Sequence, residues 1–394
     1  MYRREFIGAA VGAATSAAAT DQAVEDAVRK VGMLPRRKFG SSSREISILV
    51  GSATWDRAAV EAGIRCGINF WHKAEDWGRS VPPAILRNRE AHYCQICIDR
   101  VRGNHETGQI DEEAFYQTVK HAVAETGLRY FDDLQFHFGY HHKNELKNSR
   151  GFVRAFERLK KEGLARHLCL SQHSYNGNWF VRGGQSAAEI LTAVIDDGVF
   201  EHAQFPYSYG DEQAINDFVA LARRKGFGTI AMKTARGTGR MTRDREFMRD
   251  FPSGTTPYHA LARWLTTRTQ LDSAVIQINS AAQFADTFSG AGHALRSADL
   301  RAIDKMTAYA DGAACRLCNR CMEVCPEHVP IAEILRCERY AWDYGEPRRA
   351  GRVYAILSRR AGACTQCRAC VANCPQSFDI PVKLAGISQM LIMV

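Results

Sequence analysis

Eight of the thirteen cysteines lie near the C-terminal end of the chain, in two runs with the same spacing. Each run has the form Cys-x2-Cys-x2-Cys-x3-Cys-Pro. This spacing is typical of chains that hold two [4Fe–4S] clusters, because three thiolates on one loop bind three irons and the fourth reaches the other cluster. It predicts one cluster on Cys315, Cys318, Cys321 and Cys374, and a second on Cys364, Cys367, Cys370 and Cys325.

A zinc ribbon is the alternative for these cysteines, since it also pairs C-x-x-C motifs. It needs only four ligands, however, and gives no reason for eight in this pattern. Apolar residues at helical spacing predict two helices between the runs, and the fourth cysteine of each run is expected to begin a helix. We therefore expect a small, mainly helical dicluster ferredoxin-like domain over residues 310–385. The two linker helices are marked by Ile331, Ile334, Leu335, Tyr340, Val353, Ile356 and Leu357.

The other five cysteines are dispersed among apolar residues and are expected to be buried packing thiols. Cys94 and Cys97 form a lone C-x-x-C, but they lie in an apolar run that has the pattern of a strand. Residues three apart on a strand point to opposite faces, so these two thiols should not share a ligand. A disulfide framework would suit a short secreted chain rather than one of 394 residues. The remaining three are Cys66, Cys169 and Cys337.

From residue 36 to about 290, short apolar runs alternate with amphipathic helical stretches. Eight strand-like runs, each followed by a helical pattern, predict an α/β fold of the (β/α)8 TIM-barrel type over residues 36–295. A doubly wound open sheet is the alternative, but no G-x-G-x-x-G follows the first strand. One helix should begin at Asp111, where Glu112 and Glu113 occupy the first turn. The predicted strands are residues 46–50, 68–71, 93–99, 134–137, 167–171, 203–205, 229–232 and 274–278.

Several segments resemble the aldo/keto reductase family, and they occur in order around the predicted barrel. The resemblance covers residues 36–290 and implies a barrel whose active site lies at the C-terminal ends of its strands. A subset of this family carries a C-terminal dicluster extension, and the chain is similar to that subset. The segments that carry the resemblance are 37–40, 67–70, 130–137, 159–163, Ser171 and 231–233.

The resemblance also implies where the catalytic groups lie. The family uses a tyrosine as proton donor, a lysine and an aspartate that tune its pKa, and a histidine that orients the substrate. Here His137 matches the histidine, whereas His72 stands at the aspartate position, Trp77 at the tyrosine position and Asp99 (or its neighbour) at the lysine position. An indole N–H cannot act as a general acid. Together with Lys73, these residues are expected to form an altered acid–base site; surface ion pairs around an inactive barrel are the alternative.

The same resemblance implies a site for NADP(H). Lys233 and Arg236 lie in a glycine-bearing loop after the seventh strand, which could cradle a phosphate. Ser280 lies in the loop after the eighth strand, which lacks the family's Pro-Gly step and its arginine. Gln204 and Tyr207 match the family's glutamine and its ring that stacks on nicotinamide; a core aromatic is the alternative for Tyr207. The protein either carries a tightly held nucleotide or works without one.

The N-terminus resembles a targeting signal. Arg3 and Arg4 precede Phe6 and an Ala/Gly-rich stretch that ends at Ala19. We interpret residues 1–19 as a twin-arginine signal peptide, which would export the folded protein to the periplasm; an ordinary N-terminal helix is the alternative. No later apolar run is long enough to span a membrane.

The formal net charge is +9, but the arginines are scattered and no nucleic-acid-binding motif accompanies them. One group near the second cysteine run is interpreted as a solvated helix face, with a dock for an acidic electron carrier as the alternative. It consists of Arg348, Arg349, Arg352, Arg359 and Arg360.

Two classes of function follow from these patterns. The first is an iron–sulfur oxidoreductase, in which the barrel acts on a small carbonyl or alcohol substrate and the clusters exchange electrons with a redox partner. The second is an electron-transfer or binding protein with a catalytically inactive barrel.

Overall fold

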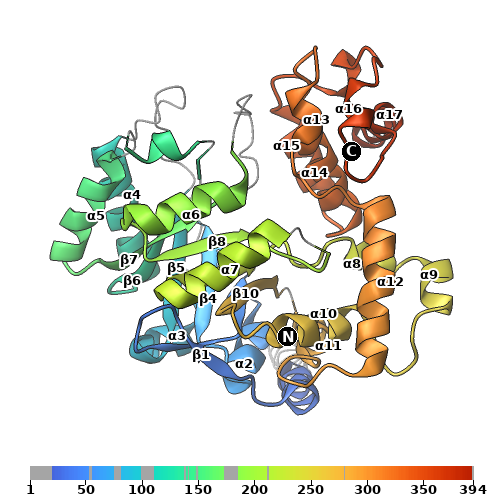
Figure 1. Ribbon diagram of the computed structural model, residues 1–394. Helices are drawn as coiled ribbons and strands as arrows, with labels where there is room; N and C mark the ends of the chain where they lie inside the picture. Colours follow the sequence, from blue (N-terminus) through green and yellow to red (C-terminus); the bar gives the residue numbers. More distant parts are fainter. Residues whose placement is uncertain are drawn as a thin grey trace, which may run out of the picture.

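The computed structural model describes residues 20–52, 56–74, 81–98, 111–136, 139–140, 142–147, 150–172, 185–210, 213–278 and 280–392. Within these ranges the chain forms a closed barrel, a long helix that leaves it, and a C-terminal module without strands (Figure 1). Residues 20–31 form a helix that precedes the barrel.

The barrel has eight parallel strands, each hydrogen-bonded to the next in the sequence, and the last pairs with the first. This closure confirms the predicted barrel and excludes the open doubly wound sheet. Each predicted strand overlaps one observed strand, but residues 46–50 belong to two, because the chain turns at Ile48 from β2 (Glu45–Ser47) into β3. The barrel strands are β3 (Leu49–Ser52), β4 (Phe70–Ala74), β5 (Tyr93–Ile98), β6 (Phe131–Phe136), β7 (Ala165–Ser171), β8 (His202–Pro206), β9 (Gly228–Met232) and β10 (Ser273–Gln277).

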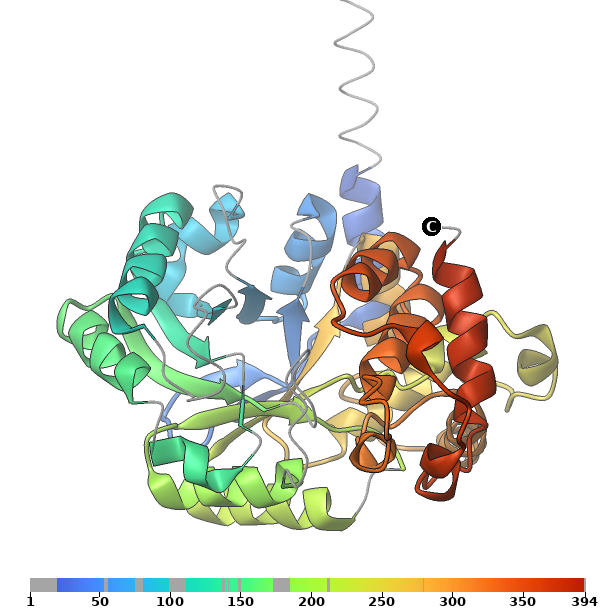
Figure 2. The same ribbon diagram turned by 90° about the horizontal axis from the view of Figure 1, so that it is seen from above.

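Helices cover the outside of this ring, as the view from above shows (Figure 2). Asp111 caps α4 by accepting the backbone N–H of Ala114, as its acidic first turn predicted. The outer helices are α2 (Arg57–Arg65), α3 (Pro83–Arg87), α4 (Glu112–Thr126), α5 (Gly151–Lys161), α6 (Ala187–Asp197), α7 (Gln213–Lys225), α10 (Pro257–Thr266) and α11 (Ala281–Phe288), with short 3-10 turns η2 (Arg89–Ala91) and η3 (Lys143–Lys147). Two short helices, α8 (Thr238–Met241) and α9 (Arg245–Arg249), follow β9, and α9 lies beyond α12 (Ser297–Ala313), away from the strands (Figure 1).

A hairpin of β1 (Arg36–Lys38) and β2 closes the N-terminal end of the barrel. It brings Phe39 and Ile46 under the first residues of β4 and β5, Phe70 and Tyr93, in one buried cluster. The sequence did not predict this hairpin, since its strands have three residues each and carry charges that hide the apolar pattern.

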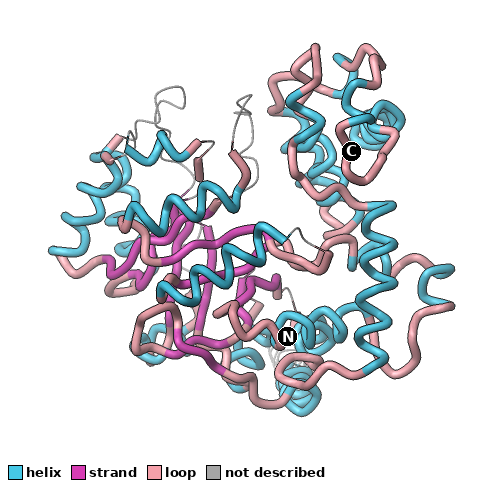
Figure 3. The backbone as a smooth tube through the Cα atoms, in the orientation of Figure 1, coloured by secondary structure: helices cyan, strands magenta, loops and turns pink. Residues whose placement is uncertain are grey.

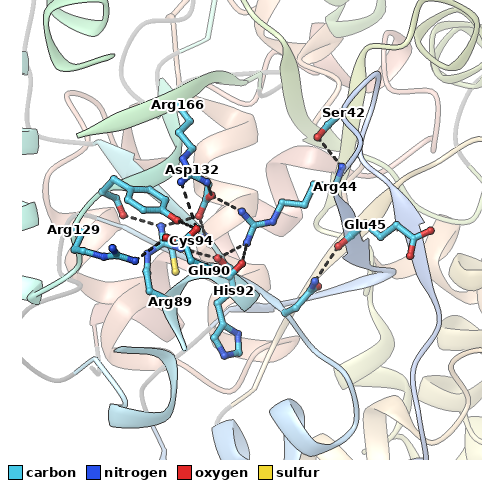
Figure 4. A network of polar contacts seen from close by, with 12 residues as sticks. Ser42, Arg44, Glu45, Arg89, Glu90, His92, Cys94, Arg129, Asp132 and Arg166 are labelled. Atoms are coloured by element: carbon cyan, nitrogen blue, oxygen red, sulfur yellow. Dashed lines mark hydrogen bonds and ion pairs between the residues drawn. The ribbon is translucent and has the colours of Figure 1, made fainter. Parts of the chain in front are cut away.

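The same end of the barrel is held by a network of charges around Asp132 (Figure 4). The Asp132 carboxylate accepts hydrogen bonds from Arg89 at 2.7 Å, Arg44 at 2.9 Å and the backbone N–H of Cys94 at 2.8 Å. Asp132 and Arg89 are both buried, and the attraction between them offsets the free energy that each charge loses on leaving water. Because it lies away from the C-terminal strand ends, this network contributes to stability rather than to chemistry.

Helix α12 (Ser297–Ala313) packs against α10 and leads into the C-terminal module. The module contains α13 (Arg320–Glu323), α14 (Ile331–Trp342), α15 (Pro347–Ala355), η4 (Ala361–Ala363), α16 (Ala369–Ala372) and α17 (Ile380–Ile392), joined only by loops (Figure 3). The two predicted linker helices are α14 and α15, although Ile356 is exposed at the end of α15.

The module is an internal repeat. The short helices α13 and α16 lie within the first and second cysteine runs, and the longer helices α14 and α17 follow these runs, at the same sequence offset. The prediction that the fourth cysteine begins a helix is wrong: Cys325 and Cys374 lie in the turns that separate each short helix from the long one. The proline after each cysteine and a left-handed residue two positions further, His328 or Ser377, delay the long helix. No helix in the described part of the chain is long and apolar enough to cross a membrane.

Candidate functional site

The structure brings the eight cysteines of the two runs together in two groups of four. We call Cys315, Cys318, Cys321 and Cys374 the first thiol set. Burial is the main cause that raises the pKa of the Cys321 thiol, and the nearby thiols of Cys315, Cys318 and Cys374, together with that of Cys370, raise it further. Cys374 comes from the second run, and Gln376 helps to hold that run beside the first by bonding to the backbone of Ala314 and Arg316.

The second thiol set consists of Cys364, Cys367, Cys370 and Cys325. Burial raises the pKa of Cys370 to about 11, and the other three thiols of this set raise it as well. All four line one small cavity of about 10 Å³, beside Val329, Ile331 and Leu384. Cys367 is exposed, so this set faces solvent on one side.

The loops around both sets have an unusual backbone. Leu317 and Asn319 in the first run, and Gln366 and Arg368 in the second, all have φ between 57° and 67°. A left-handed conformation costs a non-glycine residue about 1–2 kcal/mol, so four such residues together lower the stability of the loops by several kcal/mol. This conformation turns successive N–H groups toward one point, which favours an anionic group there. The Leu317 N–H already lies 3.2 Å from the Cys315 sulfur.

A single metal ion requires its ligands to converge on one point. Among the described residues, no group of three or more His, Cys, Asp or Glu side chains converges in this way. A cuboidal cluster places each of its four ligands on a different iron, so it takes thiols that surround a volume. The second thiol set lines such a volume.

A chain of polar side chains, half-buried at His72 and buried beyond it, crosses the interior of the barrel. His72 on β4 meets the Gln95 carbonyl through Nδ1 at 2.7 Å, and the Gln95 amide donates to Asp133 at 2.9 Å. Asp133 in turn meets Nδ1 of His202 at 3.2 Å. Since the Gln95 nitrogen is used by Asp133, its oxygen faces His72, and Nδ1 of His72 therefore carries the hydrogen.

Several other polar atoms face the same interior. Among the described residues, the buried oxygens of Tyr93, Gln135, Ser171 and Gln204 have no hydrogen-bond partner, and neither does one oxygen of Asp133. Burial, and then the charge of Asp133, raise the pKa of Tyr93 well above its usual value, so its hydroxyl stays neutral. The barrel interior is therefore polar at this level.

The C-terminal module covers the loop after β9. Arg236 in this loop is buried and ion-paired with Asp311 of α12 at 2.5 Å. Lys233 has φ +56°, and its pKa is lowered to about 7 by burial and by repulsion from Arg336 and Arg339 of α14. Both residues predicted to bind phosphate thus face the module.

The other predicted nucleotide-binding residues lie apart from this loop or have contacts with other side chains or the backbone. The Ser280 hydroxyl caps α11 by accepting the N–H of Gln283. Tyr207 is buried against Trp264, with ring centroids 5.5 Å apart, and its hydroxyl donates to Asn216. Gln204 lies inside the barrel near Met232.

Of the predicted catalytic residues, His137, Trp77 and Asp99 lie outside the described residues. Lys73 is on β4, on the opposite face from His72 by strand alternation. Sequence reasoning missed Gln95, Asp133 and His202. Two adjacent acids in an otherwise apolar strand, Asp132-Asp133, were the available signal.

No protein-family model and no curated protein sequence matches the chain. Solved structures similar to it include the holo and apo forms of an aldo-keto reductase from Bacillus halodurans. The TM-scores are 0.51 and 0.50 at 15% identity, and each match covers 69% of this chain and 96% of the other. The fold is that of an aldo-keto reductase. At this identity the likeness extends to the fold alone, and the function of this aldo-keto reductase-like barrel must be argued from its own residues.

Proposed function

We propose that the protein is an iron–sulfur oxidoreductase, in which the aldo-keto reductase-like barrel acts on a small carbonyl or alcohol and exchanges electrons with two [4Fe–4S] clusters. The observation that carries the proposal is the grouping of eight cysteines into two sets of four, each taking its fourth thiol from the other run. Thiols are the ligands that such clusters take. The left-handed loops fit a bound anionic group, since they aim N–H groups at it.

Each cluster, when bound, stores one electron. Interconversion of an alcohol and a carbonyl moves two electrons and two protons, so the two clusters together match the electrons of one turnover. The electrons would pass between the clusters and a one-electron carrier protein.

Within the barrel, we propose that His72 exchanges the hydroxyl proton of the substrate. Its Nδ1 lies 2.7 Å from the Gln95 carbonyl oxygen, and this contact fixes the orientation of the ring. Gln95 and Asp133 act as positioning residues: Asp133 fixes the orientation of the Gln95 amide, and the amide fixes the form of His72. This is the role that a carboxylate has behind a catalytic histidine in general.

The carrier would meet the second thiol set, which contains the exposed Cys367. The net charge of +9 favours an acidic carrier. Export by a twin-arginine signal in residues 1–19 would place the reaction in the periplasm.

The first test measures metal content and reduction. Anaerobically reconstituted protein should hold about eight irons and eight sulfides per chain, and dithionite should bleach the cluster absorbance. NADPH and NADH are then added separately. Bleaching by either would show that the barrel binds a nucleotide, for which Arg236 would have to leave Asp311. Bleaching by dithionite alone would exclude nicotinamide as the electron source, and a chain without iron would overturn the proposal.

The second test examines the barrel. With a panel of small alcohols and a one-electron dye as acceptor, His72→Ala should lower kcat by about 10²–10⁴-fold. Asp133→Asn should lower kcat and shift the pH profile while the cluster spectrum stays unchanged. His121→Ala is the matched control, because this exposed histidine lies on the outer helix α4. If no substrate in the panel reduces the clusters, the inactive barrel becomes the better account.

A further inference from the structure

Arg339 occupies an unusual place between the barrel and the first thiol set. It lies on α14 and is 4% exposed. Its nearest carboxylate is Asp343, with the Nε and an Asp343 oxygen 3.6 Å apart, which is too long for a good hydrogen bond. Neither Nε nor Nη2 of Arg339, both of them buried, has a hydrogen-bond partner among the residues that the structure describes. A buried cation with two unpartnered N–H groups costs several kcal/mol, so something on this side must compensate.

The surroundings of Arg339 place it beside the first thiol set, because two side chains tie its helix to the segment that leads into Cys315. Lys383 bonds to the carbonyl of Ala313 at 3.2 Å and to Glu338, the residue before Arg339, at 3.3 Å. Arg240 fixes the two segments relative to each other. It bonds to the carbonyl of Ala313, two residues before Cys315, at 3.2 Å, and to Asp343, one turn after Arg339, also at 3.2 Å.

The second thiol set has a different environment. Its neighbouring arginine, Arg368, is exposed and is already paired with Asp379 at 3.0 Å. A solvent-exposed charge that is neutralised by its own partner has little effect on a nearby site. The two sets thus have the same ligands but differ in the charge that faces them.

We propose that Arg339 tunes the cluster on the first thiol set. Its buried positive charge stabilises the reduced form of that cluster and so raises its reduction potential. This inference rests on the proposed function, since it requires the clusters. It makes the first cluster, which lies beside the barrel, the site where electrons from the barrel are held. The second cluster then passes them to the carrier.

The test is a potentiometric titration of the reconstituted full-length protein, followed by electron paramagnetic resonance. Arg339→Gln should lower one of the two midpoint potentials and leave the other unchanged. At a fixed applied potential, a tenfold change in the reduced-to-oxidised ratio corresponds to about 59 mV for a one-electron couple, and we expect a shift of about this size. Arg339→Lys should keep this midpoint potential close to that of the wild type, because lysine keeps the positive charge.

Arg368→Gln is the matched control, and it should leave both potentials close to those of the wild type. Iron content and circular dichroism establish whether each variant is folded and loaded. Unchanged potentials in fully loaded Arg339→Gln would overturn the inference while leaving the proposed function intact. An equal shift of both potentials would overturn it as well. A wild-type chain without iron would overturn the proposed function and this inference together.

Discussion

The contact between the barrel and the C-terminal module can be tested at one glycine. Gly239 lies in α8, directly against the C-terminal end of α14. A Cβ at this position would lie 1.9 Å from the carbonyl oxygen of Asp343 and 2.9 Å from its carbonyl carbon. A backbone carbonyl cannot rotate away as a side chain can. Gly239→Ala must therefore move the module away from the barrel or distort α14.

The expected cost follows from known effects of overpacking, which are about 1–3 kcal/mol. The displacement also lengthens the ion pair of Arg240 with Asp343, now 3.2 Å. Gly312→Ala is the matched control. Gly312 lies in α12, where an added Cβ would meet no atom within 4 Å, and alanine should stabilise this helix by about 0.5–1 kcal/mol.

The assay is denaturant unfolding of the loaded protein, monitored both by circular dichroism and by cluster absorbance. The two probes separate loss of the module from unfolding of the barrel. Gly239→Ala should lower the unfolding midpoint of the module, whereas Gly312→Ala should raise the midpoint or leave it unchanged. If Gly239→Ala is as stable as Gly312→Ala, the close approach of α8 and α14 is not present in solution, and the account of the covered β9 loop fails.

Three further predictions concern acid stability, the barrel base and the cluster ligands. Burial and the nearby Arg89 lower the pKa of His92 to about 4. As the pH falls, His92 therefore binds a proton in the unfolded chain before it does so in the folded chain. The free energy of unfolding should fall by up to about 3 kcal/mol between about pH 6.5 and pH 4. His92→Gln should remove this part of the acid sensitivity, and an unaltered pH profile of unfolding would contradict it. Asp132→Asn should lower the free energy of unfolding by about 3–5 kcal/mol, because it leaves the buried Arg89 charge without its partner at 2.7 Å; a loss under 1 kcal/mol would show that water reaches this network. Cys325→Ser should remove the cluster of the second thiol set only, which halves the iron content, whereas Cys337→Ser should leave it unchanged because Cys337 is a buried thiol of α14. Equal iron loss in both variants would refute the assignment of Cys325, rather than Cys337, as a cluster ligand.

The barrel strands could be predicted from the sequence because parallel strands are covered on both sides and form nearly continuous apolar runs. The assignment of the eight cysteines to two clusters also follows from their spacing, and it stays a prediction. The roles of Asp132 and Asp133 could not. Strand alternation points Asp132 toward the charge network around Arg89 and points Asp133 into the barrel interior. The partners that distinguish the two residues come from distant segments of the chain.

The loop after β9 shows another limit of sequence reasoning. Its glycines and arginine suggested a cradle for phosphate. In the structure, Gly239 allows the close approach of a backbone carbonyl, and Arg236 binds a carboxylate of α12. Both interpretations require the same residue types, because a carboxylate and a phosphate attract the same donors. Only the placement of residues more than seventy positions later in the chain, which no local pattern encodes, separates them.

The internal repeat of the module has a consequence for symmetry. Two equivalent halves, α13–α14 and α16–α17, would give two equivalent sites if the module stood alone. The barrel has no matching symmetry, so it can cover only one half, and it covers α14. Docking therefore breaks the equivalence without any change of ligands. The contact with the barrel thus gives the repeated module an inner half, which faces the barrel, and an outer half, which does not.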